Sequence, residues 1–280
     1  MYKQIKQLES YNKILCLFVI VLTCIFFVLY LSPFLWVLLI AIKPPGITFA
    51  IPPVWNFKPT LEHFKMLFTS FGLQTYIKNS LIVLVSSVTL TMSIGLLAGY
   101  AFARFQKNSF LLGIIFFSRI VPPMVLLLPL FVLGQKLGLS NTRIALILSY
   151  QFFLMPVAVW LLKGYFSSIP IEIEESAIID GASHFQILIY IVMPIAKPGL
   201  AATILLCSIF CWNEFLFPLV LTTTPASKVL TVVLPNFLSD YGIEWGPLAA
   251  ATMVVVIPLL ILSISFKNFL IEGITEGVGK

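Results

Sequence analysis

Long apolar runs with almost no charge constrain this sequence more than any other feature. Residues 14–42 contain no Asp, Glu, Lys or Arg, and about 20 apolar residues in a helix already cross the ~30 Å hydrocarbon core of a bilayer. Inside hydrocarbon, every backbone N–H and C=O group needs a partner within the protein, which an α-helix provides by itself. The sequence therefore predicts an all-α membrane protein.

Charged residues separate six such runs, which predict six transmembrane helices. The runs cover residues 14–42, 79–103, 108–135, 144–162, 198–227 and 245–266. A single charge interrupts two of them, Arg119 in the third and Glu214 in the fifth. The first run is longer than the apolar core of a signal peptide, about 7–15 residues, and no A-x-A-like site follows it, so we expect it to be retained as a helix.

Composition agrees with a membrane solvent and argues against nucleic acid as a partner. The chain is 60% hydrophobic and 10% charged, with a mean hydropathy of +1.05, whereas soluble domains carry about 25% charged residues. The net charge of +6 comes from basic residues scattered singly between apolar runs. That distribution is typical of charges flanking membrane helices and not of a nucleic-acid-binding stripe.

The distribution of Lys and Arg indicates which ends of the helices face the cytoplasm. An even number of spans places both termini on the same side. With the termini inside, the inner segments hold nine Lys and Arg and the outer segments seven, a small excess in the direction of the positive-inside rule. We therefore expect residues 1–13 and 269–280 to be cytoplasmic and residues 43–78 to form an external loop.

The sequence holds no motif for ATP binding or for catalysis. It lacks G-x-x-x-x-G-K-[ST], H-E-x-x-H and G-x-S-x-G, so we expect neither an enzyme nor a bound cofactor or metal. Its cysteines lie inside apolar runs without a C-x-x-C pair, as expected for small apolar side chains; they are Cys16, Cys24, Cys207 and Cys211. His63 and His184 lie in loops with no catalytic partner spaced to either, and we expect plain polar roles.

The segment between Lys163 and Lys197 looks unlike a simple connector. It concentrates acidic residues in a chain that has few, namely Glu172, Glu174, Glu175 and Asp180. We expect a short helix beginning near Pro170 and capped by Ser168. Gly181 then predicts a bend, and residues 182–193 a second helix that ends before Pro194.

The same segment resembles a known family motif. Glu175-Ser176-Ala177 is followed by three residues, Gly181, nine residues, Ile191, one residue and Met193-Pro194. This spacing is similar to the EAA loop of permeases in binding-protein-dependent ABC importers, EAA-x3-G-x9-I-x-LP. Two letters depart from the pattern, Ser176 for Ala and Met193 for Leu, and both keep the size class.

The resemblance implies a fold and a set of partners. It implies the type I ABC importer permease fold, with a membrane domain over residues 79–268 and a coupling loop over residues 164–197 that docks on an ATP-binding subunit. The residues implied in that contact are Glu174, Glu175, Ala177, Asp180, Gly181 and Pro194. ATP hydrolysis would then belong to a separate chain.

Further stretches resemble carbohydrate permeases of the maltose and polyol type. They are residues 79–81, 98–105, 162–166, 212–215 and 272–277. The resemblance implies import of a sugar or polyol across a bacterial plasma membrane. It also implies a second permease subunit, two ATP-binding subunits and an extracytoplasmic sugar-binding protein as partners.

The charged and polar residues inside the runs have two interpretations each. Asn213, Glu214 and Phe217 are candidates for the substrate path, because a charge in the bilayer centre is costly and should face a polar interior; the alternative is that they fix helix packing. Arg119 could form a gate ion pair, or its side chain could reach the headgroups.

Two other classes of protein remain as alternatives. An ion-coupled secondary transporter would carry its own ion and substrate sites, and such folds usually show internal repeats and broken helices near the midplane, neither of which is evident in the sequence. A membrane enzyme would need a catalytic constellation, and none is present. The sequence therefore favours the importer permease.

Overall fold

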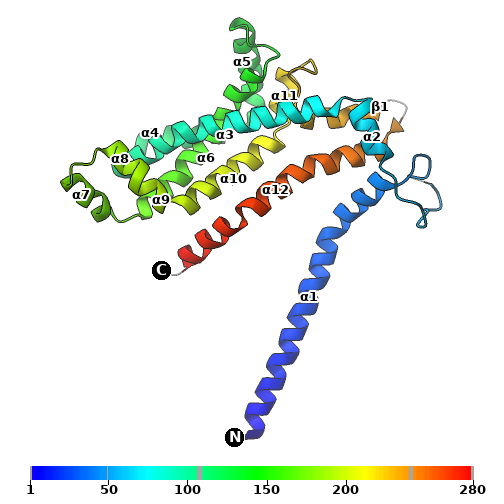
Figure 1. Ribbon diagram of the computed structural model, residues 1–280, viewed down its shortest axis with the longest axis horizontal. Coiled ribbons are helices and arrows are strands. Elements are labelled where there is room, and N and C mark those ends of the chain that lie inside the picture. The colour runs from blue at the N-terminus through cyan, green and yellow to red at the C-terminus, as the bar shows by residue number, and fades with distance from the viewer. Residues whose placement is uncertain (1, 49, 106–108, 240–241, 279–280) are drawn as a thin grey trace. The chain divides into compact units, whose positions relative to one another are not determined.

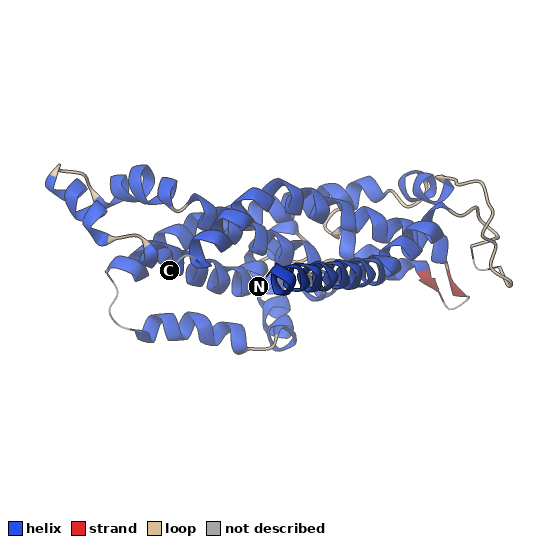
Figure 2. Ribbon diagram, turned by 90° about the horizontal axis from the view of Figure 1, so that it is seen from below, coloured by secondary structure: helices blue, strands red, loops and turns tan. Residues whose placement is uncertain are grey.

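The computed structural model describes residues 2–48, 50–105, 109–239 and 242–278. Helices make up almost all of the described secondary structure (Figures 1 and 2), which confirms the predicted all-α class. The chain divides into two compact units. Unit 1 comprises Met1–Ser70 and Ser239–Met253, and unit 2 comprises Phe71–Leu238 and Val254–Lys280.

Unit 1 contains two helices, a small strand pair and the start of a third helix. Helix α1 spans Tyr2–Ile42, α2 spans Glu62–Thr69, and α12, which begins here, spans Trp245–Val278. The two-residue strands are β1 at Leu238–Ser239, on the boundary of the units, and β2 at Gly242–Ile243. Nearly all described side chains of α1 up to Leu38 are exposed, as expected of a helix whose apolar surface contacts lipid.

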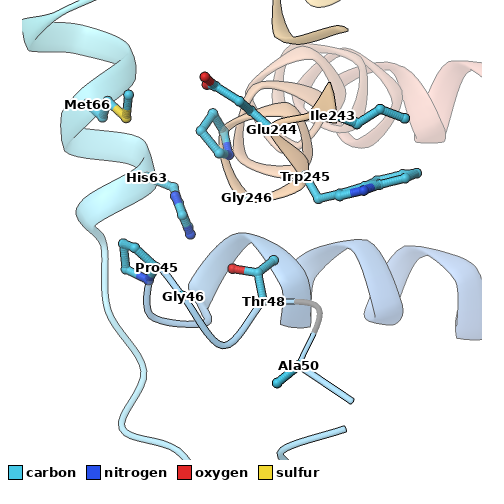
Figure 3. Close-up of a pocket in the computed structure, with 11 residues that line it drawn as sticks. Pro45, Gly46, Thr48, Ala50, His63, Met66, Ile243, Glu244, Trp245 and Gly246 are labelled. Carbon is cyan, nitrogen blue, oxygen red and sulfur yellow. The ribbon is translucent and has the colours of Figure 1, made fainter. Parts of the chain in front are cut away.

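A cavity of about 470 Å³ lies within unit 1. Its walls include Pro45, Thr48, His63 and Trp245 (Figure 3). A Cβ atom at Gly246 would overlap the imidazole ring of His63, which is 5% exposed. The glycine therefore allows α2 and the start of α12 to pack together around the buried histidine.

The core of unit 2 is a set of three helices that lie side by side (Figure 1). They are α3 at Leu73–Arg104, α6 at Arg143–Ser168 and α10 at Lys197–Asn213. Helix α3 begins at Leu73, before the expected start at residue 79. The most extensive contact in the described chain is the one between α3 and α6.

Small residues allow α3 and α6 to approach closely. A Cβ atom at Gly99 would lie 2.8 Å from Cβ of Leu162 and 3.2 Å from the backbone nitrogen of Lys163, and one at Gly95 would lie 3.2 Å from Cβ of Ala158. In lipid, helices associate through such close packing and through hydrogen bonds, because burial from water contributes little. Gly95 and Gly99 form the corresponding small-xxx-small pair on α3.

A buried polar contact adds to this packing. The Thr91 hydroxyl on α3 donates to Oε1 of Gln151 on α6 at 2.8 Å, and the Gln151 amide donates to the carbonyl of Ile147 at 2.8 Å. Interhelical hydrogen bonds of this kind contribute about 0.6 kcal/mol on average in membranes. The contact thus specifies the register of α3 against α6.

The predicted single helix over residues 108–135 is wrong, because the chain breaks at two prolines. Helix α4 spans Ser109–Ile120 and α5 spans Pro123–Lys136, with a bend of 95° between them. Pro122 has extended backbone, with ψ of 133°, and Pro123 lacks the N–H that would continue the helix. A proline also disfavours helical backbone at the residue before it.

The fifth run is also not a single helix, contrary to the prediction for residues 198–227. Helix α10 ends at Asn213, and Glu214 is extended, with ψ of 129°. The short helix α11 at Leu216–Leu221 and the 3₁₀ helix η2 at Leu230–Phe237 follow. The polar pair at residues 213–214 is therefore where this span breaks.

Four described helices are long and apolar enough to cross a membrane, and the number rises to six if each bent pair counts as one span. These four are Leu15–Ile42, Leu73–Arg104, Arg143–Ser168 and Trp245–Lys267. The bent pairs are α4 with α5, and His184–Ile195 with α10, the latter bent by 83°. The predicted six spans correspond to this upper count.

The α3–α6 contact predicts the effect of one methyl group. Gly99→Ala should lower the free energy of unfolding by about 1–3 kcal/mol, because the backbone of α6 must shift to accommodate the new Cβ. The measurement is the thermal unfolding midpoint of the purified protein in detergent. The control is Gly113→Ala on α4, where a Cβ meets no atom within 4 Å; equal midpoints for the two variants would contradict the packing argument.

Candidate functional site

The acidic segment forms a short helix that projects from the end of α6. Helix α7 spans Ile171–Ile179 and begins after Pro170, whose ring supplies the backbone angle at the N-cap. Glu172 and Glu174 lie in its first turn, where carboxylates stabilise the positive end of the helix dipole. The predicted cap by Ser168 is wrong, because its hydroxyl donates to the carbonyl of Tyr165 at 2.8 Å.

The predicted bend at Gly181 is confirmed. Gly181 has a φ of +86°, a left-handed conformation that glycine adopts without the steric cost of a Cβ. A second helical piece then begins at His184. Ser183 and Gln186 form a capping box there: the Ser183 N–H donates to Oε1 of Gln186 at 2.9 Å, and the Gln186 N–H donates to the Ser183 hydroxyl at 3.4 Å.

The second piece does not stop before Pro194, contrary to the prediction. Helix α8 at His184–Ile187, the π-helix η1 at Leu188–Val192 and helix α9 at Met193–Ile195 follow one another without a gap. The wider π turn just ahead of Pro194 accommodates a residue that cannot donate a helical hydrogen bond. Pro194 itself is exposed.

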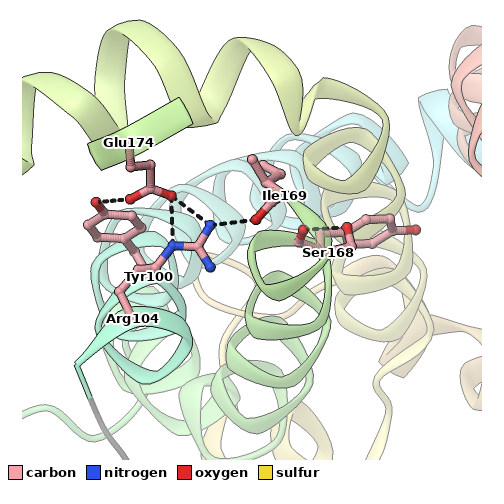
Figure 4. Close-up of polar contacts among 6 residues, drawn as sticks. Tyr100, Arg104, Ser168, Ile169 and Glu174 are labelled. Atoms are coloured by element: carbon pink, nitrogen blue, oxygen red, sulfur yellow. Dashed lines mark hydrogen bonds and ion pairs between the residues drawn. The ribbon is translucent and has the colours of Figure 1, made fainter. Parts of the chain in front are cut away.

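Glu174 is buried and bound within the chain. Its Oε1 lies 2.6 Å from Nη2 and 2.7 Å from Nε of Arg104. Its Oε2 accepts a hydrogen bond from the Tyr100 hydroxyl at 2.7 Å. Arg104 Nη2 also donates at 3.0 Å to the carbonyl of Ile169, between α6 and α7. Figure 4 shows these contacts, which attach α7 to the end of α3.

The energetics of this cluster depend on its completeness. The side chains of Arg104 and Glu174 are 8% and 5% exposed, so both charges have lost most of their hydration. Removing one partner from a buried ion pair costs about 3–5 kcal/mol, because the remaining charge is left uncompensated. The cluster therefore holds α7 at a fixed position on α3 as long as all three side chains are present.

Tyr100 and Arg104 are functional candidates that the sequence reasoning missed. They lie four residues apart and so on one face of α3, at the end of a span that the predicted topology places on the same side of the membrane as the acidic segment. That combination was the available signal. It points to an acid in the loop as the partner, although it does not say which of the acids takes that place.

The C-terminal tip of α7 is open to a partner. Ile178 and Ile179 are 47% and 86% exposed, and the neighbouring Glu175 and Asp180 are exposed as well. Ala177 is half-buried. An exposed apolar tip flanked by charge is typical of a surface that binds another protein. Of the residues expected in such a contact, Glu174 alone is turned inward; Gly181 and Pro194 are exposed.

The expected path residues lie at the break between α10 and α11. The exposed Asn213 amide donates to the carbonyl of Ile209 at 2.9 Å. Oε1 of Glu214 accepts from the N–H groups of Leu216 and Phe217 at 2.8 and 3.1 Å, so it caps α11. Phe217 is 1% exposed, and it stacks on Phe153 with ring centroids 5.8 Å apart. Their role in a substrate path stays a prediction.

Known proteins are similar to this chain in sequence and in fold. The profile of the family described as "Binding-protein-dependent transport system inner membrane component" matches residues 91–271. The chain is 34% identical over 255 residues to the probable ABC transporter permease protein y4oR of Sinorhizobium fredii, covering 91% of this chain and 92% of the relative. It is 35% identical over 259 residues to the trehalose/maltose transport system permease protein MalG of Thermococcus litoralis, covering 90% and 92%.

A solved structure has the same fold. It is a chain of a bacterial ABC transporter involved in the import of the acidic polysaccharide alginate, with a TM-score of 0.78 and 21% sequence identity. The match covers 92% of this chain and 97% of that one. The likeness extends over nearly the whole length of both chains, and at this identity it concerns the fold.

The buried cluster predicts how firmly α7 is held. Glu174→Ala and Arg104→Ala should each raise amide hydrogen exchange throughout α7, by tenfold or more, because they remove its attachment to α3. Hydrogen–deuterium exchange of the purified protein measures this. The matched control is Glu175→Ala, the next residue on α7 and exposed, which should leave exchange unchanged; equal exchange in all three variants would show that the cluster does not hold the helix.

Proposed function

Because the chain belongs to the family of binding-protein-dependent transport system inner membrane components, we propose that it forms half of the membrane path of an ATP-driven importer for a sugar or polyol. It is an ABC transporter permease and not an ion-coupled secondary transporter. The observation that carries the proposal is the α7 loop, anchored on α3 by Glu174 and open to a partner at Ile178 and Ile179.

The substrate class rests on the relatives and on the motifs. A relative that matches 90% of this chain is a trehalose/maltose permease. The stretches at residues 98–105 and 212–215 resemble carbohydrate permeases as well. A sugar or polyol is therefore the cargo that best fits the chain.

The partners follow from what the chain lacks and what it exposes. It has no nucleotide-binding motif, so ATP must bind to another subunit, and we assign two copies of it. The exposed tip at Ile178 and Ile179 is its docking point, with Glu175, Ala177, Asp180, Gly181 and Pro194 around it. A second permease subunit would complete the path, and an extracytoplasmic sugar-binding protein would deliver the cargo.

This assignment also orients the chain in a plasma membrane. The ATP-binding subunits are cytoplasmic, so α7 and the adjoining end of α3 face the cytoplasm. With six spans, we therefore assign both termini to the cytoplasm and residues 43–78 to the outside. We assign residues 79–268 to the membrane domain, with residues 164–197 as its coupling loop.

The coupling mechanism follows from the buried cluster. Closure of the ATP-binding subunits displaces the docked tip of α7. Glu174 transmits this displacement to Arg104 and Tyr100 at the end of α3, and Arg104 also holds the Ile169 carbonyl at the junction with α6. Because α3 packs closely on α6, both helices move with α7 and change the access to the path.

The path itself is proposed to pass the break between α10 and α11. Asn213 is exposed there and has amide and carbonyl groups that suit sugar hydroxyls. Glu214 and Phe217 shape the break, the first as the cap of α11 and the second by packing on Phe153.

The docking tip gives a direct test of this function. In the reconstituted importer, Ile179→Asp should abolish binding of the ATP-binding subunit and reduce sugar uptake by at least tenfold, because a charge replaces an apolar contact. Co-purification and ATP-driven uptake into proteoliposomes measure both effects. The control is Ser176→Ala on the same helix, which removes one local hydrogen bond to the Glu172 carbonyl and should leave both unchanged.

The energy source separates this function from its rival. Uptake should require ATP hydrolysis and persist when proton and sodium gradients are collapsed with ionophores. Uptake that stops with the gradients while ATP remains would contradict the proposal.

A further inference from the structure

A second cavity lies in the membrane-embedded part of unit 2, between α4, α6 and α10. Its volume is about 500 Å³, and its walls include the aromatic side chains Phe116, Trp160 and Phe210 together with Arg119. The remaining wall is aliphatic. The cavity is separate from the break at Asn213 and Glu214, which do not line it.

The aromatic rings and the cation are arranged around the same space. Phe116 and Trp160 meet edge to face, with ring centroids 6.4 Å apart and an interplanar angle of 85°. The guanidinium carbon of Arg119 lies 5.4 Å from the ring centroid of Phe210, within the range of a cation–π contact. Trp160 is 58% exposed, so part of its ring is not covered by the neighbouring helices and is available to a ligand.

Arg119 has no carboxylate within ion-pair distance among the described residues. It lies ten residues along α4 from Ser109, which corresponds to about 15 Å of helix. That is roughly half of the ~30 Å hydrocarbon thickness. A charge inside an apolar run is costly in lipid and should face a polar interior.

The chemistry of this cavity fits a pyranose ring. The apolar face of a sugar ring packs on aromatic side chains, and a ligand site typically combines apolar walls with a few convergent polar groups. The Arg119 guanidinium carries five N–H donors and no acceptor, so it suits the oxygen atoms on the edge of a sugar. An acyl chain would use the aromatic wall but would leave the guanidinium without a partner.

We infer that this cavity is a sugar subsite of the translocation path, in which a pyranose ring packs on Trp160 and Phe210 while Arg119 donates hydrogen bonds to its oxygen atoms. The inference rests on the proposed function for the identity of the cargo. It assigns Arg119 a role in binding substrate. The subsite meets α10 at Phe210, three residues before Asn213.

The test is a binding titration that needs neither ATP nor a partner subunit. The full chain in lipid nanodiscs is titrated with glucose, galactose and mannose while tryptophan fluorescence is recorded. At least one of these pyranoses should give a saturable change that Trp160→Phe removes. Mannitol, an acyclic polyol with similar hydroxyl groups and no ring, should bind at least tenfold more weakly.

Variants test the individual contacts. Arg119→Gln and Phe210→Ala should each raise the half-saturating concentration at least tenfold. Leu148→Ala changes an exposed side chain on α6 outside the cavity and should keep the original value. The thermal midpoint of each variant is measured as well, and Arg119→Lys, which keeps the charge, should recover part of the affinity.

Three outcomes would overturn the inference. They are no saturable change with any of the three pyranoses, equal binding of mannitol, or full affinity in Arg119→Gln and Phe210→Ala. Lipid that co-purifies with the chain and is lost in Arg119→Gln, without any sugar signal, would identify a lipid site instead. ATP-driven uptake by the assembled importer is measured separately, so that a failed subsite is distinguished from a failed transport function.

Discussion

The carboxylate of Glu174 and the guanidinium of Arg104 form the contact on which the functional geometry depends. The pair joins two elements seventy residues apart in sequence, and it is buried at a place where an unpaired charge would be costly. Tyr100 satisfies the second carboxylate oxygen, and Arg104 also binds the backbone at Ile169. With α7 held in this way, Ile178 and Ile179 are left exposed at its C-terminal tip.

Helix α3 extends this constraint across the whole unit. At its far end, the Asn79 amide donates to the carbonyls of Pro225 and Lys228 at 3.0 and 2.8 Å. Between the two ends, Gly95 and Gly99 bring α3 close against α6. Helix α3 is thus tied at one end to α7 and at the other to the segment after α11. In the proposed importer, this is the connection through which a displacement of α7 would reach the path.

The sequence predicted the class of protein and the bend at Gly181 but not the breaks in the helices. Length and apolarity identify spans, and the EAA-like spacing identifies the loop, because both are local properties. The bend at Pro122 and Pro123 and the end of α10 at Asn213 depend on which backbone groups find partners in the folded chain. The inward turn of Glu174 was equally hidden, since four acids lie within nine residues and only the contact with Arg104 on α3 distinguishes it.

In the proposed mechanism, α7 and α3 move as one body when ATP is bound. Spin labels at Leu97→Cys on α3 and Ser176→Cys on α7, both exposed positions, report on it in the assembled importer after the native cysteines are replaced. Double electron–electron resonance should give the same distance distribution between the labels without nucleotide and with ATP under non-hydrolysing conditions. A shift of that distribution by several ångströms on ATP binding would show that α7 moves independently of α3 and would contradict the account.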